Sequence, residues 1–182
     1  MKDVTTTSFG YVIAFLLPGL FGMYGLGFWS HRVEILMRTA GTADATLGPS
    51  LIVLFAALAF GLFLSAARFF LFEKMVCRGK SLDPRVFLLL RDADRLSLFK
   101  EIADAHYRYH QFYGGCFVAA PISYLGWLTT SYNELSCVAG VASFAVFLFV
   151  ELLLWKSAVS SFHMYVARGN MAGTEDQVSV DH

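Results

Sequence analysis

The chain has 182 residues, of which 57% are hydrophobic and only 15% are charged. A soluble domain carries about 25% charged residues to cover its surface, so this composition excludes an ordinary soluble fold and indicates that lipid is the solvent. The 14 basic and 14 acidic side chains balance to a formal net charge of zero, so we expect no direct binding of nucleic acid.

The first apolar stretch predicts a membrane-spanning helix over residues 9–30. It carries no charge from Phe9 to Trp29 and would be about 31 Å long at roughly 1.5 Å per residue, enough for a hydrocarbon core of about 30 Å. Its apolar part is too long for a signal peptide and no small-x-small cleavage site follows it, so we expect the helix to be retained. Pro18 followed by Gly19 predicts a kink or a local widening in mid-span.

The second apolar stretch, residues 50–72, is uncharged except for Arg68 and predicts a second span. In lipid, helices associate where small residues allow their backbones to approach closely. Small residues recur at about every fourth position in the first two spans and again in the fourth. We therefore expect the following helix-packing positions, which serve either packing within a four-helix bundle or contact with another copy: Gly10, Ala14, Pro18, Gly22, Ala57, Gly61, Ser65 and Gly140.

Residues 82–113 predict a helical segment outside the membrane, between the second and third spans. Asp83 followed by Pro84 is a typical helix start, and apolar residues then recur at three- and four-residue spacing. The end of the segment is rich in aromatic and basic side chains, which favour the boundary between lipid and water. It predicts an interfacial belt made of Tyr107, Arg108, Tyr109, His110 and Tyr113.

His106 and His110 are four residues apart, so they share one face of the predicted helix and form a weak candidate for a metal site. A metal needs further ligands, and only Asp104 is close in the sequence. We therefore interpret both as interfacial or core histidines and expect neither a metal nor a cofactor. No phosphate-binding glycine loop, GxSxG motif or HExxH motif occurs, so we expect no catalytic residues and no enzyme.

Residues 114–132 and 136–160 predict the third and fourth spans, and the fourth contains Glu151. Counting about 1.5 Å per residue places Arg68 and Glu151 at a similar depth, in the cytoplasmic third of the bilayer. An ionised side chain inside the bilayer costs about 2.5–3.5 kcal/mol or more unless it is paired, so we expect an intramembrane ion pair between them. Two alternatives are that Arg68 reaches the headgroups, and that Glu151 faces a watery vestibule as an ion or proton site.

The distribution of basic residues predicts the orientation. With four spans, 12 of the 14 Lys and Arg residues fall on the side that holds both termini and the segment 82–113, and two, Arg32 and Arg38, fall in the loop on the other side. Basic residues are retained in the cytoplasm. The sequence therefore predicts a multi-pass protein of the plasma (inner) membrane with cytoplasmic N and C termini.

Together these features predict an all-α integral membrane protein, with four transmembrane helices in a bundle over residues 1–165 and a flexible cytoplasmic tail over residues 166–182. The predicted function is non-enzymatic: an assembly of copies of this chain in the lipid bilayer, either pore- or channel-like or a scaffold. One alternative is a membrane-anchoring accessory subunit whose segment 82–113 docks a soluble cytoplasmic protein, for example in a two-component bacterial defence system. A second alternative is a small transporter or a membrane enzyme.

Overall fold

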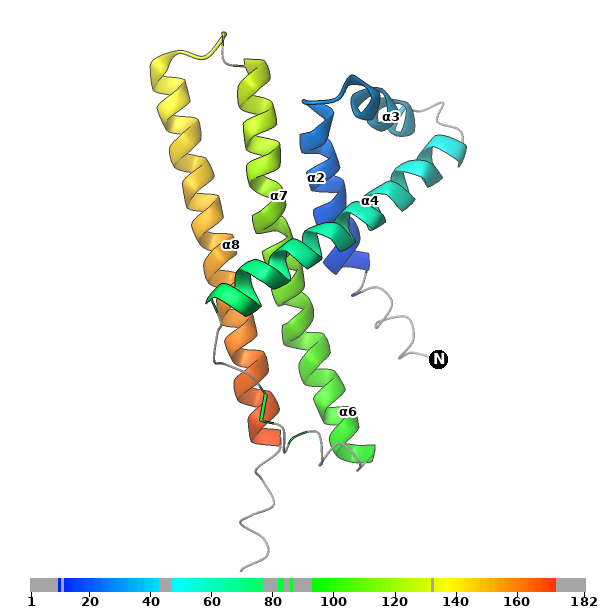
Figure 1. Cartoon of the computed structure of the whole chain (residues 1–182), viewed down its shortest axis with the longest axis vertical. Coiled ribbons are helices and arrows are strands. Elements are labelled where there is room, and N and C mark those ends of the chain that lie inside the picture. Colours follow the sequence, from blue (N-terminus) through cyan, green and yellow to red (C-terminus); the bar gives the residue numbers. More distant parts are fainter. Residues whose placement is uncertain are drawn as a thin grey trace, which may run out of the picture.

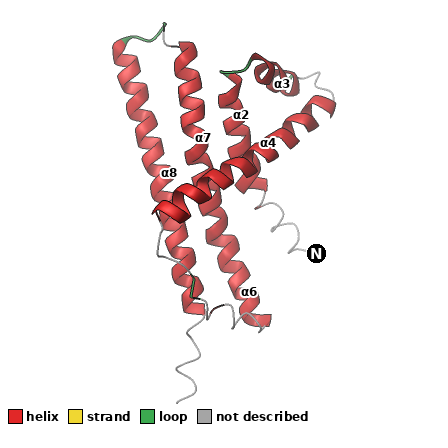
Figure 2. Ribbon diagram, viewed as in Figure 1, coloured by secondary structure: helices red, strands yellow, loops and turns green. Residues whose placement is uncertain are grey.

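The computed structural model describes residues 10, 12–42, 47–76, 82–83, 86, 93–131 and 133–172, with only the backbone at 93–95 and 172. Within these ranges the chain forms helices joined by short turns and contains no strand (Figures 1 and 2). The predicted all-α class is confirmed. Residue 9, where the first span is predicted to begin, and the tail from residue 173 onward lie outside the described residues, as does much of the first third of the segment 82–113.

Most of the described helices follow the predicted spans and the segment between them. In chain order, the α- and π-helical elements are η1 (Val12–Leu16), α2 (Leu17–Gly27), α3 (His31–Gly41), α4 (Leu47–Arg68), η2 (Phe69–Val76), α6 (Ala93–Ile102), η3 (Ala103–Tyr107), α7 (Arg108–Ser131) and α8 (Cys137–Ala172).

The longest feature of the fold is an antiparallel helix pair. The helices α6, η3 and α7 follow one another without a break, and α8 lies beside them (Figure 1). At the start of α8, the Ser136 hydroxyl accepts a hydrogen bond from the Ala139 amide at 3.2 Å, which caps the first turn of this helix. With 36 residues, α8 is about 54 Å long at roughly 1.5 Å per residue, well beyond the predicted end at residue 160.

The helix α2 packs against both α4 and α7, and its glycines make this possible. A Cβ atom on Gly19 would collide with the Ala57 carbonyl group of α4, and one on Gly61 of α4 would collide with the Phe15 carbonyl group of η1. On the other side, a Cβ atom on Gly25 would lie 2.6 Å from the Ser123 Cα atom of α7. The three helices therefore touch backbone to backbone, and α4 crosses the others obliquely (Figure 1).

Among the described residues, three segments are π-helical. The segment η1 ends at Leu16, two residues before Pro18, whose missing N–H interrupts the α-helical hydrogen bonds, so the widening predicted from Pro18 and Gly19 is present. The segment η2 continues α4, and η3 joins α6 to α7. Such turns are rare and frequently occur at functional sites.

Residues between the first two apolar stretches were expected to form a loop, and the structure differs there. The helix α3 occupies much of this region, and the Glu34 carboxylate pairs with Arg38 at 3.4 Å and with His31 at 3.3 Å. Pairs at these spacings stabilise a helix by a few tenths of a kcal/mol each. This pattern of charges is the sequence signal that the loop prediction overlooked.

Two of the described helical stretches are long and apolar enough to cross a membrane. They are Leu47–Val76, which joins α4 and η2, and Cys137–Met171 in α8. Val12–Gly27 is a shorter apolar helix. The helices at the predicted second and fourth spans therefore have the dimensions that a membrane requires, and the first is apolar over a shorter length.

Candidate functional site: a buried polar network

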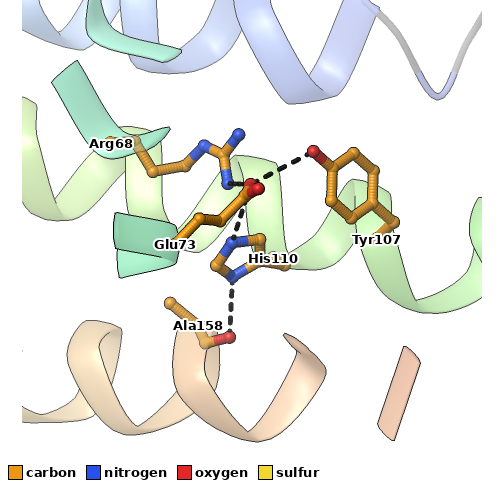
Figure 3. A network of polar contacts seen from close by, with 5 residues as sticks. All are labelled: Arg68, Glu73, Tyr107, His110 and Ala158. Atoms are coloured by element: carbon orange, nitrogen blue, oxygen red, sulfur yellow. Dashed lines mark hydrogen bonds and ion pairs between the residues drawn. The ribbon is translucent and has the colours of Figure 1, made fainter. Parts of the chain in front are cut away.

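A network of polar side chains lies where α4 meets α7 and α8 (Figure 3). Arg68 is the last residue of α4, and its side chain is only 3% exposed. Its stem crosses Gly114 of α7, where an added Cβ atom would lie 2.6 Å from the Arg68 Cγ and Cδ atoms. The Nη1 atom donates a hydrogen bond to Glu73 Oε1 at 3.1 Å. The ion pair is therefore buried, and the glycine makes room for it.

Glu73 is the shared acceptor of this network. Besides Arg68, the Tyr107 hydroxyl donates a hydrogen bond to the same Oε1 atom at 3.2 Å, and His110 Nε2 lies 3.9 Å from it (Figure 3). Burial, and then the negative charge of Glu73, raise the pKa of the Tyr107 phenol. The phenol therefore stays protonated and remains a donor.

His110 connects the network to α8. Its ring is completely buried, and Nδ1 lies 2.8 Å from the Ala158 carbonyl oxygen. A carbonyl only accepts, so Nδ1 carries a hydrogen. The other nitrogen, Nε2, has no hydrogen-bond partner among the described residues and points toward Glu73 (Figure 3). His110 and Glu73 are thus placed so that a proton on Nε2 would lie between an imidazole and a carboxylate.

Aromatic rings enclose these polar groups. Phe72 meets the rings of His110, Phe117 and Trp155 at centroid distances of 5.8, 5.4 and 5.0 Å. Phe162 meets His110 at 5.1 Å. The aromatic rings therefore shield much of a polar network that joins three helices.

No family model, curated protein or solved structure matches the chain.

The partner of Arg68 differs from the expected one. Arg68 pairs with Glu73, and both carboxylate oxygens of Glu151 lack a hydrogen-bond partner within the described part of the chain. In an α-helix, residues five apart point about 140° away from each other. The π-helical turn at η2 brings Glu73 to the face of Arg68, because its repeat is wider. Glu151 remains buried in α8, with 9% of its surface exposed.

The small residues of the first two spans lie inside the chain. Ala14, Pro18 and Gly22 are buried, as are Ala57 and Gly61. Gly10 lies against the Arg108 side chain, and Ser65 is partly exposed on α4. Gly140 of α8 differs from these, because an added Cβ atom there would meet nothing within 4 Å. The structure therefore brings the stripes of η1, α2 and α4 together within one chain and leaves Gly140 open.

The residues of the predicted interfacial belt point in different directions. His110 and Tyr107 belong to the buried network, whereas Tyr109 is 54% exposed. Tyr113 is partly exposed and stacks on Tyr109, with 6.3 Å between ring centroids. Arg108 pairs with Asp104 at 2.6 Å.

The two histidines of the weak metal candidate do not gather further ligands. His110 Nδ1 donates a hydrogen bond to the Ala158 carbonyl group. A search of the described residues finds no group of three or more His, Cys, Asp or Glu side chains that could hold a metal ion.

Sequence reasoning missed Glu73 and the Ala158 carbonyl group. Glu73 is the first acidic residue after the second apolar stretch, which is the signal that could have found it. Its spacing from Arg68 argued against a contact, since the π-helical turn is not visible in the sequence. A backbone carbonyl carries no sequence signal at all.

Proposed function

We propose that this protein is a non-enzymatic integral membrane protein that crosses the bilayer four times and assembles with copies of itself, as a channel-like or scaffold assembly. The observation that carries the proposal is the apolar outer surface of the two long helices. Large hydrophobic side chains are exposed along both, including Phe55 and Phe63 on α4 and Val141, Phe149 and Leu152 on α8. Contiguous apolar surface of this extent is unusual in water and needs lipid or protein to cover it.

The four spans of the proposal are α2 with η1, α4, α7 and the first two thirds of α8. The first and third pack closely on their neighbours through glycine, so they need fewer lipid-facing residues than α4 and α8 do. In this arrangement both termini are cytoplasmic, in the plasma (inner) membrane, in agreement with the distribution of basic residues.

The upper part of α8 supports contact between copies. Gly140 lies where an added Cβ atom would meet nothing, and Ser136 and Phe144, one turn away on the same side of the helix, are exposed. Small exposed residues on a membrane helix allow another helix to approach closely. We infer that this face of α8 packs against a second copy.

Disulfide cross-linking in membranes tests the assembly. With the native cysteines replaced by serine, Gly140→Cys should cross-link two copies on oxidation. Gly48→Cys is the matched control, because Gly48 at the start of α4 is equally open. Equal cross-linking at both positions, or a monomer by native mass spectrometry in detergent, would contradict assembly through α8.

A second candidate is an accessory subunit that docks a soluble cytoplasmic protein. It is favoured by the paired helical extension beyond the proposed membrane region, where Phe99 of α6 and Tyr107 of η3 pack on Tyr165 of α8 at 6.1 and 5.0 Å between centroids. Leu98 and Glu101 are exposed there. Capture of a soluble protein by the wild-type chain and not by a Leu98→Glu variant would support this reading.

A further inference from the structure

Glu151 is enclosed between two aromatic layers of the contact between α7 and α8. One turn before it, Phe147 stacks on Tyr124 at 4.2 Å between centroids, and one turn after it, Trp155 meets Phe117 at 5.4 Å. The residue therefore faces the stretch of α7 between Phe117 and Tyr124, which contains Ala119 and Ala120, both buried. It is nine-tenths buried itself.

Both carboxylate oxygens of Glu151 are inaccessible and lack a hydrogen-bond partner among the described residues, and no described ion pair includes them. Several titratable or charged groups stand on the elements around this contact. They are Cys116, His110 and Tyr124 on α7, Arg68 and Glu73 on α4 and η2, and the exposed Lys156 on α8. Arg68, the buried cation among them, is already paired with Glu73.

An ionised carboxylate in this position would have neither water nor a counter-charge. Buried charges of this kind are costly and neutralise instead. A metal cation would need several oxygen ligands, whereas a proton needs only the carboxylate oxygen itself. We propose that Glu151 is a proton-binding site inside the membrane domain, occupied in this arrangement of α7 and α8; the proposal rests on the membrane embedding proposed above.

A shallow, mainly apolar groove lies near this site, but Glu151 is not part of its lining. The groove has a volume of about 480 Å³ and lies between α2, α7 and α8. Its lining carries the hydroxyls of Ser123, Tyr124 and Ser143 and extends to Val150, the neighbour of Glu151. On release at high pH, the carboxyl O–H bond breaks, the carboxylate keeps the electron pair, and hydroxide accepts the proton to form water.

The buried network lies on the other side of the site. Ala158, whose carbonyl group accepts from His110, is about 10 Å along α8 from Glu151 at roughly 1.5 Å per residue (Figure 3). The bulky rings of Phe72 and Trp155 lie between Glu151 and the buried network. The proton site and the network are thus separate in the arrangement that the structure shows.

Infrared difference spectroscopy of the full chain in liposomes tests the proposal. At neutral pH the wild type should show the C=O stretching band of a protonated carboxyl group, and Glu151→Gln should lose this band completely. Glu34→Gln is the matched control, since Glu34 is exposed and paired with basic residues, and it should leave the band unchanged. In the wild type, the band should disappear as the pH is raised.

Three results would overturn the proposal. The first is an absence of any protonated carboxyl band in the wild type at neutral pH, which needs no variant. The second is a band that persists in Glu151→Gln. The third is a band that disappears when sodium chloride is added at constant pH, which would assign the site to a sodium ion. Resistance to alkaline extraction, measured on the same liposomes, shows separately whether the chain is embedded.

Discussion

Among single residues, Glu73 is the shared acceptor in the polar network that links three helices. Its Oε1 atom accepts from Arg68 and Tyr107 and faces His110, which is bonded to α8 through the Ala158 carbonyl group. A carboxylate in this position neutralises a buried guanidinium group that has no access to water. The loss of its charge would therefore leave Arg68 buried without a counter-charge.

Replacing Glu73 with glutamine should lower stability strongly. The amide keeps the shape of the side chain but removes the charge that pairs with Arg68, so we expect a loss of about 3 kcal/mol, as for other broken buried ion pairs. The measurement is the thermal unfolding midpoint in detergent micelles. As a control, Glu34→Gln breaks exposed ion pairs and should cost less than about 1 kcal/mol. Equal losses in the two variants would show that the Arg68 pair is not stabilising.

The sequence predicts only part of the environment of Arg68. The sequence indicated that Arg68 needs a partner, because an unpaired charge at that depth is costly. It did not identify Glu73, because the identity of the partner depends on a π-helical turn and not on spacing in an ideal α-helix. Glu151, the expected partner, is buried as a separate acid.

At the scale of elements, the close approach of η1 and α2 to α4 depends on two glycines. Gly19 and Gly61 each lie against a backbone carbonyl group of the neighbouring helix, where no side chain fits. Such contacts replace the hydrophobic driving force that is missing between helices in lipid. The spacing of small residues indicated which positions approach a helix, but not that the partner belongs to the same chain.

Alanine at either of these glycines should force the helices apart. We expect Gly19→Ala and Gly61→Ala each to cost about 1–3 kcal/mol, because the obstructing atoms belong to the backbone and cannot rotate away. Thermal unfolding in detergent measures the effect. Gly48→Ala is the matched control: the site at the start of α4 is open, and alanine should be neutral or stabilise the helix by up to about 1 kcal/mol. A tolerated Gly61→Ala would contradict the close packing.

The helices themselves were largely predictable, and their ends were not. Long apolar stretches and the absence of alternating patterns predict helices at all four expected spans, and the structure has helices there. It also has α3, whose amphipathic pattern was treated as a loop, and an α8 that continues to Ala172. Continuation depends on packing against α6 and η3, which is a tertiary contact that the local sequence does not encode.

At the scale of the whole molecule, the described residues combine oblique and upright helices. The helix α4 crosses in front of α2 and α7, whereas α7 and α8 run side by side along the long axis (Figure 1). The apolar outer faces of α4 and α8 carry the membrane assignment, and the turn between α7 and α8 is the natural position to test it.

Labelling of Cys137 tests the proposed orientation. This free cysteine is exposed at the start of α8, which the proposed orientation places outside the cell. A membrane-impermeant maleimide should therefore label it in intact cells, and Cys137→Ser should abolish this labelling. Cys116, which is partly buried in α7, should stay unlabelled. Labelling of Cys137 only after the cells are permeabilised would reverse the orientation, and a chain that stays in solution without detergent would contradict the membrane embedding.

In the proposed membrane arrangement, the oblique course of α4 has a consequence for the surrounding lipid. The proposed span α4 has 22 residues, or about 33 Å at roughly 1.5 Å per residue, against a hydrocarbon core of about 30 Å. To match the two, α4 would lean roughly 25° from the bilayer normal, within the usual range of tilt. Thicker membranes would favour a more upright α4, which pulls on the glycine contacts with its neighbours, so acyl-chain length becomes a variable that sets the shape of this protein.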